Sequence, residues 1–192
     1  MESIFISCGV VALAEIGDKT QLLAFVLAAR FKKPVPIVLG ILVATLANHG
    51  LAGALGAWIT RVVAADLLRW LLGLSFLAMA VWTLIPDKIE EEEDEVAGRL
   101  GVFGATLVTF FLAEIGDKTQ VATVALAAHF GAALAVVAGT TLGMLIADLP
   151  AVFIGNSLSS RIPMRAVHGA AAVIFAVLGV VTLFSAPSGL NL

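Results

Sequence analysis

Charged residues are scarce in this chain. Asp, Glu, Lys and Arg make up 13% of its 192 residues, whereas 60% are hydrophobic. The mean hydropathy of +1.07 is well above that of a water-soluble domain of this size, so the composition excludes a soluble globular protein. The net charge of −3 comes largely from one acidic run at 90–95, and we therefore expect no nucleic-acid partner.

Several catalytic and compartmental signals are also missing. Cys8 is the only cysteine, so no intrachain disulfide can form. The sequence has no histidine pair at metal-binding spacing, no nucleophile elbow and no phosphate-binding loop. We therefore expect neither an enzyme nor a resident cofactor. No basic segment precedes the first apolar stretch, and acidic residues lie at Glu2 and Glu15, which predicts a retained helix rather than a signal peptide.

Long apolar stretches dominate what is present. A helix needs roughly 20 residues to cross the hydrocarbon core of a bilayer. Six stretches are long enough: Ile4–Phe31, Pro36–Ile59, Leu67–Ile85, Val102–Phe130, Ala132–Leu158 and Ala166–Phe184. The sequence therefore predicts an all-α, multi-pass integral membrane protein with six transmembrane helices, which has the lipid bilayer as a partner.

The chain contains an internal repeat. Residues 13–21 read LAEIGDKTQ, and residues 112–120 read the same letters, an offset of 99 (112 − 13). The same offset pairs Gly40 with Gly139 and Phe76 with Phe175 without gaps. We therefore divide the chain into a first three-helix repeat at 1–86, an acidic linker at 87–99, expected in the cytoplasm, and a second three-helix repeat at 100–192.

An odd number of crossings in each repeat predicts that the second repeat enters the membrane from the opposite side. Transporters built from such inverted repeats place their substrate and ion sites near the midplane, where the repeats meet. Basic residues in the loops predict the orientation. Two of them, Arg61 and Arg69, fall on one side, and seven fall on the other: Arg30, Lys32, Lys33, Lys88, Arg99, Arg161 and Arg165. Both termini are therefore predicted to lie outside the cytoplasm.

The repeated motif places ionisable residues inside the membrane. At 1.5 Å per residue, Glu15 lies about 16 Å beyond Ile4, near the middle of a hydrocarbon layer about 30 Å thick. Glu114 lies at a similar depth from Val102. Charges at this depth are expensive and are usually functional. Glu and Asp are three residues apart in each motif, so a continuous helix would place both carboxylates on one face.

Four carboxylates of the two motifs are the predicted metal ligands: Glu15, Asp18, Glu114 and Asp117. Gly17 and Gly116, inside the motifs, permit either close helix approach or local unwinding, and unwinding would free backbone carbonyls as further ligands. The predicted supporting residues are Lys19, Thr20, Gln21, Lys118, Thr119, Gln120, Asn48 and Asp148. Oxygen ligands suit magnesium, calcium or manganese, whereas the scarcity of cysteine and histidine argues against zinc or copper. We expect Glu15 and Glu114 to couple protons, because protons and metal compete for the same carboxylates.

The motif lysines leave an alternative open. Glu15 can pair with Lys19, and Glu114 with Lys118, at the favourable four-residue spacing, so that the charges merely neutralise one another. In a mixed form of the two hypotheses, lysine holds the site together when it is empty.

The second helix of each repeat carries a weaker polar signal. The offset pairs Asn48–His49 with Ala147–Asp148. These residues could complete a coordination shell, relay protons, or form interhelical hydrogen bonds. His129 and His168 lie near predicted helix ends, where we expect interfacial roles.

The two E-x-G-D-K-T sequences, Glu15–Thr20 and Glu114–Thr119, resemble the paired signature of the GDT-type family of cation/proton exchangers. The resemblance covers nearly the whole chain, since that family has two three-helix units, each with one motif on its first helix, joined by an acidic loop. It implies that manganese, and in some members calcium, is exchanged for protons along a path lined by the four motif carboxylates. The lack of an extra N-terminal segment resembles bacterial members, which implies export across the bacterial cytoplasmic (inner) membrane.

We therefore predict a secondary transporter that exports Mn2+ from the cytoplasm in exchange for protons. The alternatives are a Ca2+/proton exchanger and a small-solute exporter of the lysine-exporter type, whose helices are similarly few and short. An intramembrane hydrolase using the paired carboxylates is the least favoured class. A monomer and a homodimer both fit the sequence.

Overall fold

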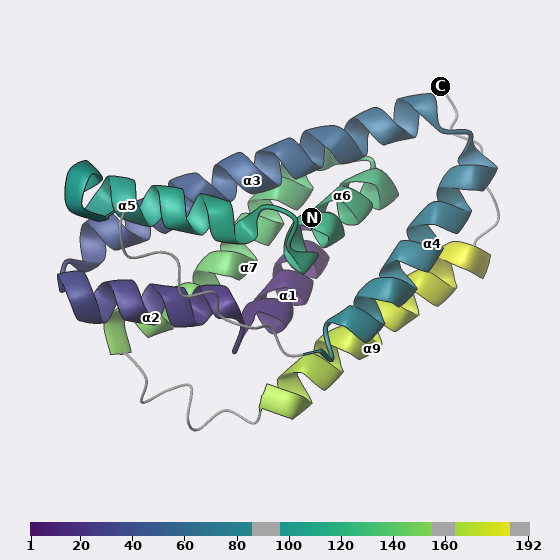
Figure 1. The fold of residues 1–192 in the computed structure, drawn as a ribbon. Coiled ribbons are helices and arrows are strands. Elements are labelled where there is room, and N and C mark those ends of the chain that lie inside the picture. The colour runs from purple at the N-terminus through teal and green to yellow at the C-terminus, as the bar shows by residue number, and fades with distance from the viewer. Residues whose placement is uncertain (86–96, 155–163, 185–192) are drawn as a thin grey trace.

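The computed structural model describes residues 1–85, 97–154 and 164–184, and the regular structure in these ranges is helical. The first repeat forms α1 (Glu2–Glu15), α2 (Lys19–Phe31), α3 (Pro34–Val62) and α4 (Ala65–Trp82). The second forms α5 (Ala97–Glu114), α6 (Lys118–Phe130), α7 (Ala133–Ile154) and α9 (Met164–Phe184), as Figure 1 shows. Most of the acidic linker, at 87–96, lies outside the described residues. So do two of the basic residues used for the orientation, Lys88 and Arg161, and the side chains of two more, Arg99 and Arg165.

Two of the predicted membrane spans are not continuous helices. The stretch 4–31 is divided into α1 and α2, and the stretch 102–130 into α5 and α6, which are bent by 71° at their break. Both breaks fall inside the repeated motif, where Gly17 has a φ of 87° and Gly116 a φ of 75°. Only glycine adopts such positive φ values at little cost. Local unwinding, one of the two roles considered for these glycines, is therefore confirmed, and the continuous helix is wrong.

Several helices are suited to a membrane. α3, α4 and α7 are each long and apolar enough to cross one, and the bent pair α5–α6 would add a fourth span. α9 contributes a shorter apolar segment, His168–Phe184. Large apolar side chains such as Leu51, Trp58 and Phe153 are exposed on these helices, as expected for a surface that faces lipid. The prediction of an all-helical membrane protein is confirmed, while the count of six crossings stays a prediction.

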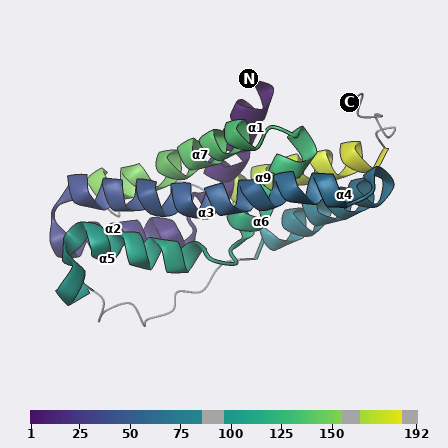
Figure 2. The ribbon, with the colours of Figure 1, turned by 90° about the horizontal axis from the view of Figure 1, so that it is seen from above.

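The broken helices of each repeat pack against the long helix of the other. α1 lies along α7, and α5 lies along α3 (Figures 1 and 2). Glycines at equivalent positions permit the close approach. A Cβ atom on Gly40 of α3 would lie 2.7 Å from the Cβ atom of Thr106 in α5, and one on Gly139 of α7 would lie 2.5 Å from the carbonyl oxygen of Ile4 in α1. Small residues at such contacts are typical of helix packing in membranes.

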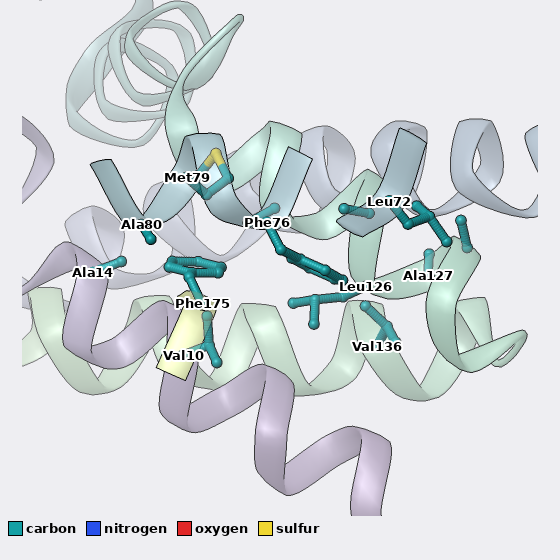
Figure 3. Packing of buried hydrophobic residues seen from close by; sticks show 13 residues of the cluster. Val10, Ala14, Leu72, Phe76, Met79, Ala80, Leu126, Ala127, Val136 and Phe175 are labelled. Atoms are coloured by element: carbon teal, nitrogen blue, oxygen red, sulfur yellow. The ribbon is translucent and has the colours of Figure 1, made fainter. Parts of the chain in front are cut away.

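α4 and α9 lie side by side at one end of the molecule (Figure 1). Phe76 of α4 and Phe175 of α9, which the offset relates, stack with their ring centroids 6.4 Å apart. Figure 3 shows them inside a buried apolar cluster that also contains Val10 of α1 and Leu126 of α6. Helices from both repeats therefore share this core.

We expect Gly139→Ala to lower the stability of the protein, because the added methyl group would overlap the carbonyl oxygen of Ile4. Overpacking of this kind costs about 1–3 kcal/mol, so the midpoint of thermal unfolding in detergent should fall. Gly50→Ala in α3 is the matched control, since nothing lies within 4 Å of the Cβ position there. Equal midpoints for the two variants would contradict the packing of α1 on α7.

Candidate metal centre

Each repeated motif ends one helix and begins the next. Glu15 is the last residue of α1 and Asp18 is the N-cap of α2, and Glu114 and Asp117 hold the same places between α5 and α6. Each aspartate thus lies at the positive end of a helix dipole. The prediction that Glu and Asp share one face of a continuous helix is wrong, because the break separates them. All four carboxylates are nevertheless buried.

Three of the four predicted ligands converge. Glu15, Asp18 and Asp117 each offer an oxygen atom, and these atoms lie within 4.8 Å of one another. Glu114 is not part of this group, but the hydroxyl of Thr119 lies between it and Asp117, at 3.1 Å from Glu114 Oε2 and 3.4 Å from Asp117 Oδ2. The structure therefore brings carboxylates from both repeats to one buried centre.

One oxygen of each glutamate is left over. Oε1 of Glu15 and Oε1 of Glu114 are buried and have no hydrogen-bond partner among the described residues. A buried carboxylate oxygen without a partner is costly. The arrangement therefore suits a cation or a proton at these atoms.

The two motif lysines pair with the aspartates of the opposite motif. Lys19 Nζ lies 3.2 Å from Asp117 Oδ1, and Lys118 Nζ lies 2.9 Å from Asp18 Oδ2. These ion pairs join the two repeats. The alternative pairing within each motif, Glu15 with Lys19 and Glu114 with Lys118 at the four-residue spacing, is not the one observed. The two pairs also differ in burial, since the side chain of Lys19 is 28% exposed and that of Lys118 is 1% exposed.

The threonine and the glutamine of each motif brace the helix break. Thr20 Oγ1 donates to Glu15 Oε2 at 2.6 Å, and Gln21 Oε1 accepts a hydrogen bond from the Gly17 N–H at 2.9 Å. The second motif repeats both contacts, at 3.1 Å and 2.8 Å. Gln21 also donates from Nε2 to the carbonyl oxygen of Ala147 in α7 at 2.7 Å. The threonines thus position the glutamates, and the glutamines satisfy amides that the break exposes.

The polar residues predicted on the second helix of each repeat have different surroundings. Asn48 of α3 donates from Nδ2 to the carbonyl oxygen of Phe111 at 3.0 Å and so ties α3 to α5. Asp148 of α7 is buried, interacts electrostatically with Asp18, and has no hydrogen-bond partner for either carboxylate oxygen in the described part of the chain. His49 is buried with no partner for its ring nitrogens among the same residues. Asp148 therefore extends the acidic cluster, whereas Asn48 ties two helices together.

One contact at the first break was not predicted. His168 of α9 lies with Nε2 2.9 Å from the carbonyl oxygen of Ile16, which accepts a hydrogen bond from it in the Nε2–H tautomer. The offset pairs His168 with Arg69, but Arg69 lies near Asp66 of its own helix, so the repeat carries no signal for this contact. His129 lies with Nδ1 3.2 Å from Thr182 Oγ1, and the interfacial role expected for it stays a prediction.

A helical membrane protein whose broken helices carry carboxylates from two repeats to one buried centre has the architecture of an ion transporter. The family described as divalent cation/proton antiporter GDT1 matches residues 3–91 and 102–189. The chain therefore belongs to this family of transporters and is a membrane protein.

Relatives of the chain are found in bacteria and plants. A Vibrio cholerae protein named "Putative manganese exporter" is 48% identical over 96% of this chain and 92% of its own length. A Synechocystis GDT1-like protein is 30% identical over 90% of this chain and 92% of its own length. The rice GDT1-like protein 3 is 29% identical over 97% of this chain and 75% of its own length. No solved structure matches the chain at a significant level.

We expect Asp18→Asn to destabilise the metal-free protein more than Asp117→Asn. Removing one partner of a buried ion pair costs about 3–5 kcal/mol, and Lys118 is buried at this pair. The side chain of Lys19 is 28% exposed, so the loss at its pair should be smaller. The measurement is the midpoint of thermal unfolding in detergent with a chelator present.

The double variant Asp18→Asn/Lys118→Met provides the control for this experiment. It leaves neither member of the pair charged, so it should recover much of the stability lost in Asp18→Asn. Equal losses for the two aspartate variants, or no recovery in the double variant, would contradict the ion pairs as described.

Proposed function

We propose that this protein is a secondary transporter that exports Mn2+ from the cytoplasm across the bacterial inner membrane in exchange for protons. The observation that carries the proposal is the convergence of Glu15, Asp18 and Asp117, with oxygen atoms from both repeats within 4.8 Å of one another. Membership in a family of divalent cation/proton antiporters supports it. So does the name of the Vibrio cholerae relative, which refers to manganese export.

The chemistry of the ligands favours a hard divalent cation. Carboxylate oxygens suit Mn2+, Mg2+ and Ca2+ better than they suit softer metals. With all ionisable groups charged, the two motifs carry four negative and two positive charges, or −2 in total, which one divalent cation neutralises. We assign Glu15, Asp18, Glu114 and Asp117 as the ligands over the transport cycle, with Asp148 adding negative charge from α7.

Proton coupling follows from competition for the same atoms. Thr20 and Thr119 each hold one oxygen of a motif glutamate, and the other oxygen, Oε1, faces no partner among the described residues. A proton bound there reduces the negative charge that holds the metal, and a metal bound nearby disfavours the proton. Glu15 and Glu114 are therefore the proposed proton-coupling residues.

Alternating access is proposed to arise from exchange of shape between the two repeats. The packing of α1 on α7 and of α5 on α3 supports this. In each pair, the broken helix belongs to one repeat and the long helix that it packs against belongs to the other. In our proposal the repeats are inverted in the membrane, the chain crosses it six times, and both termini lie outside the cytoplasm. The site would then open alternately to the two sides.

We expect the purified protein in liposomes to move Mn2+ against an oppositely directed flux of protons. An imposed pH gradient should drive Mn2+ accumulation, and a protonophore should abolish it, because the gradient supplies the free energy. The measurement is Mn2+ content together with internal pH, repeated with Ca2+, Mg2+ and an amino acid. Exchange with Ca2+ but not Mn2+ would replace the proposal by a calcium exchanger, and metal-independent amino-acid flux would replace it by a solute exporter.

We expect Glu15→Gln and Glu114→Gln to weaken Mn2+ binding by about 10- to 100-fold or more, the range seen when groups around a metal site are removed. Cells lacking the protein should accumulate manganese and become sensitive to it, and neither variant should rescue them. Glu2→Gln is the matched control, since this glutamate is exposed at the start of α1. Normal rescue by both motif variants would contradict the assignment of Glu15 and Glu114 to the transport site.

A further inference from the structure

The two ion pairs of the motifs occupy the atoms that a metal would need. Asp18 and Asp117 belong to the group of three carboxylates that converge within 4.8 Å. Each of them is held by the ammonium group of a lysine from the other motif, at 2.9 Å and 3.2 Å. A cation that enters the centre therefore competes with two ammonium groups for the same carboxylates.

At the two aspartates, taken without the glutamates, the exchange balances in charge. Lys19 and Lys118 together carry two positive charges, which is the charge of one divalent cation. A buried site that holds neither lysines nor metal would leave two aspartates uncompensated, and isolated charges inside the membrane are expensive. With both lysines in place, the aspartates are neutralised in the absence of metal.

We propose that Lys19 and Lys118 are tethered cations, which hold Asp117 and Asp18 in the metal-free transporter and leave them when the metal binds. The inference rests on the proposed function, because it takes these aspartates as metal ligands. It gives both lysines a role as positioning residues and specifies what metal binding must displace.

The burial of the two pairs sets an order for the displacement. The side chain of Lys19 is 28% exposed and that of Lys118 is 1% exposed. α6, which begins at Lys118, packs chiefly against α3 and also contacts α7, α4 and α1, whereas α2, which begins at Lys19, contacts α7, α5 and α3. In our proposal an entering cation therefore reaches the more exposed Lys19–Asp117 pair before the buried Lys118–Asp18 pair.

A purely structural ion pair and a tethered cation predict opposite results for Lys19→Met. If the lysine only supports the fold, its removal leaves Mn2+ affinity unchanged or weaker. If it competes with the metal, its removal strengthens Mn2+ binding by about two- to fivefold, the strength of a partly exposed charge pair. The measurement is calorimetric titration of the full chain in detergent with Mn2+ at constant pH.

Two variants control this titration. Lys19→Arg keeps the charge and should bind Mn2+ about as the wild type does. Lys33→Met removes an exposed lysine at the start of α3 and should leave the affinity unchanged. Unchanged or weaker binding by Lys19→Met overturns the tethered-cation proposal, provided that the wild type binds Mn2+. If the wild type does not bind Mn2+, the result contradicts the proposed function itself.

A second measurement does not depend on the folding of any variant. An ammonium group held by a carboxylate reacts slowly with amine reagents, so Mn2+ should increase the modification of Lys19 in the wild-type protein, read by mass spectrometry. Lys33 serves as the internal reference within the same sample. Modification of Lys19 that stays the same or falls when Mn2+ saturates the protein overturns the proposal.

Discussion

The structure depends on one interaction, namely the pairing of two buried aspartates with lysines across the two repeats. Asp18 and Asp117 are buried, and each finds its partner in a lysine of the other repeat. These two ion pairs join the repeats at their centre, and they specify the partner residues more narrowly than apolar packing can. The helix breaks at Gly17 and Gly116 serve the same end, because they turn both aspartates to the starts of new helices, where their charge is favoured.

Much of the fold and of the site could be predicted from the sequence, because hydropathy and repetition are strong signals. The helical membrane class, the unwinding at Gly17 and Gly116, and the burial of the motif carboxylates follow from the residues alone. The pairing of Lys19 could not be predicted, since spacing along the chain only reveals local neighbours, and a partner 98 residues away (117 − 19) is set by tertiary packing. The contact of His168 with a released carbonyl was missed for the same reason.

Identical sequence does not give identical surroundings in this chain. The two motifs share nine letters, yet Glu15 lies in the converging group and Glu114 outside it. The outer helices also pack differently, since α4 packs against α6, whereas α9 packs against α1. One set of local interactions is therefore held in two different environments, as alternation between two states would require.

The contact between Phe76 and Phe175 has a consequence for how the halves can move. The two rings hold the same place in their repeats and stack on each other. If the two repeats exchange conformations, each ring takes the position of the other, so the contact between them is kept. This pair can therefore act as a pivot, and a change of size at one ring would unbalance the two directions of motion unless the other ring changed with it.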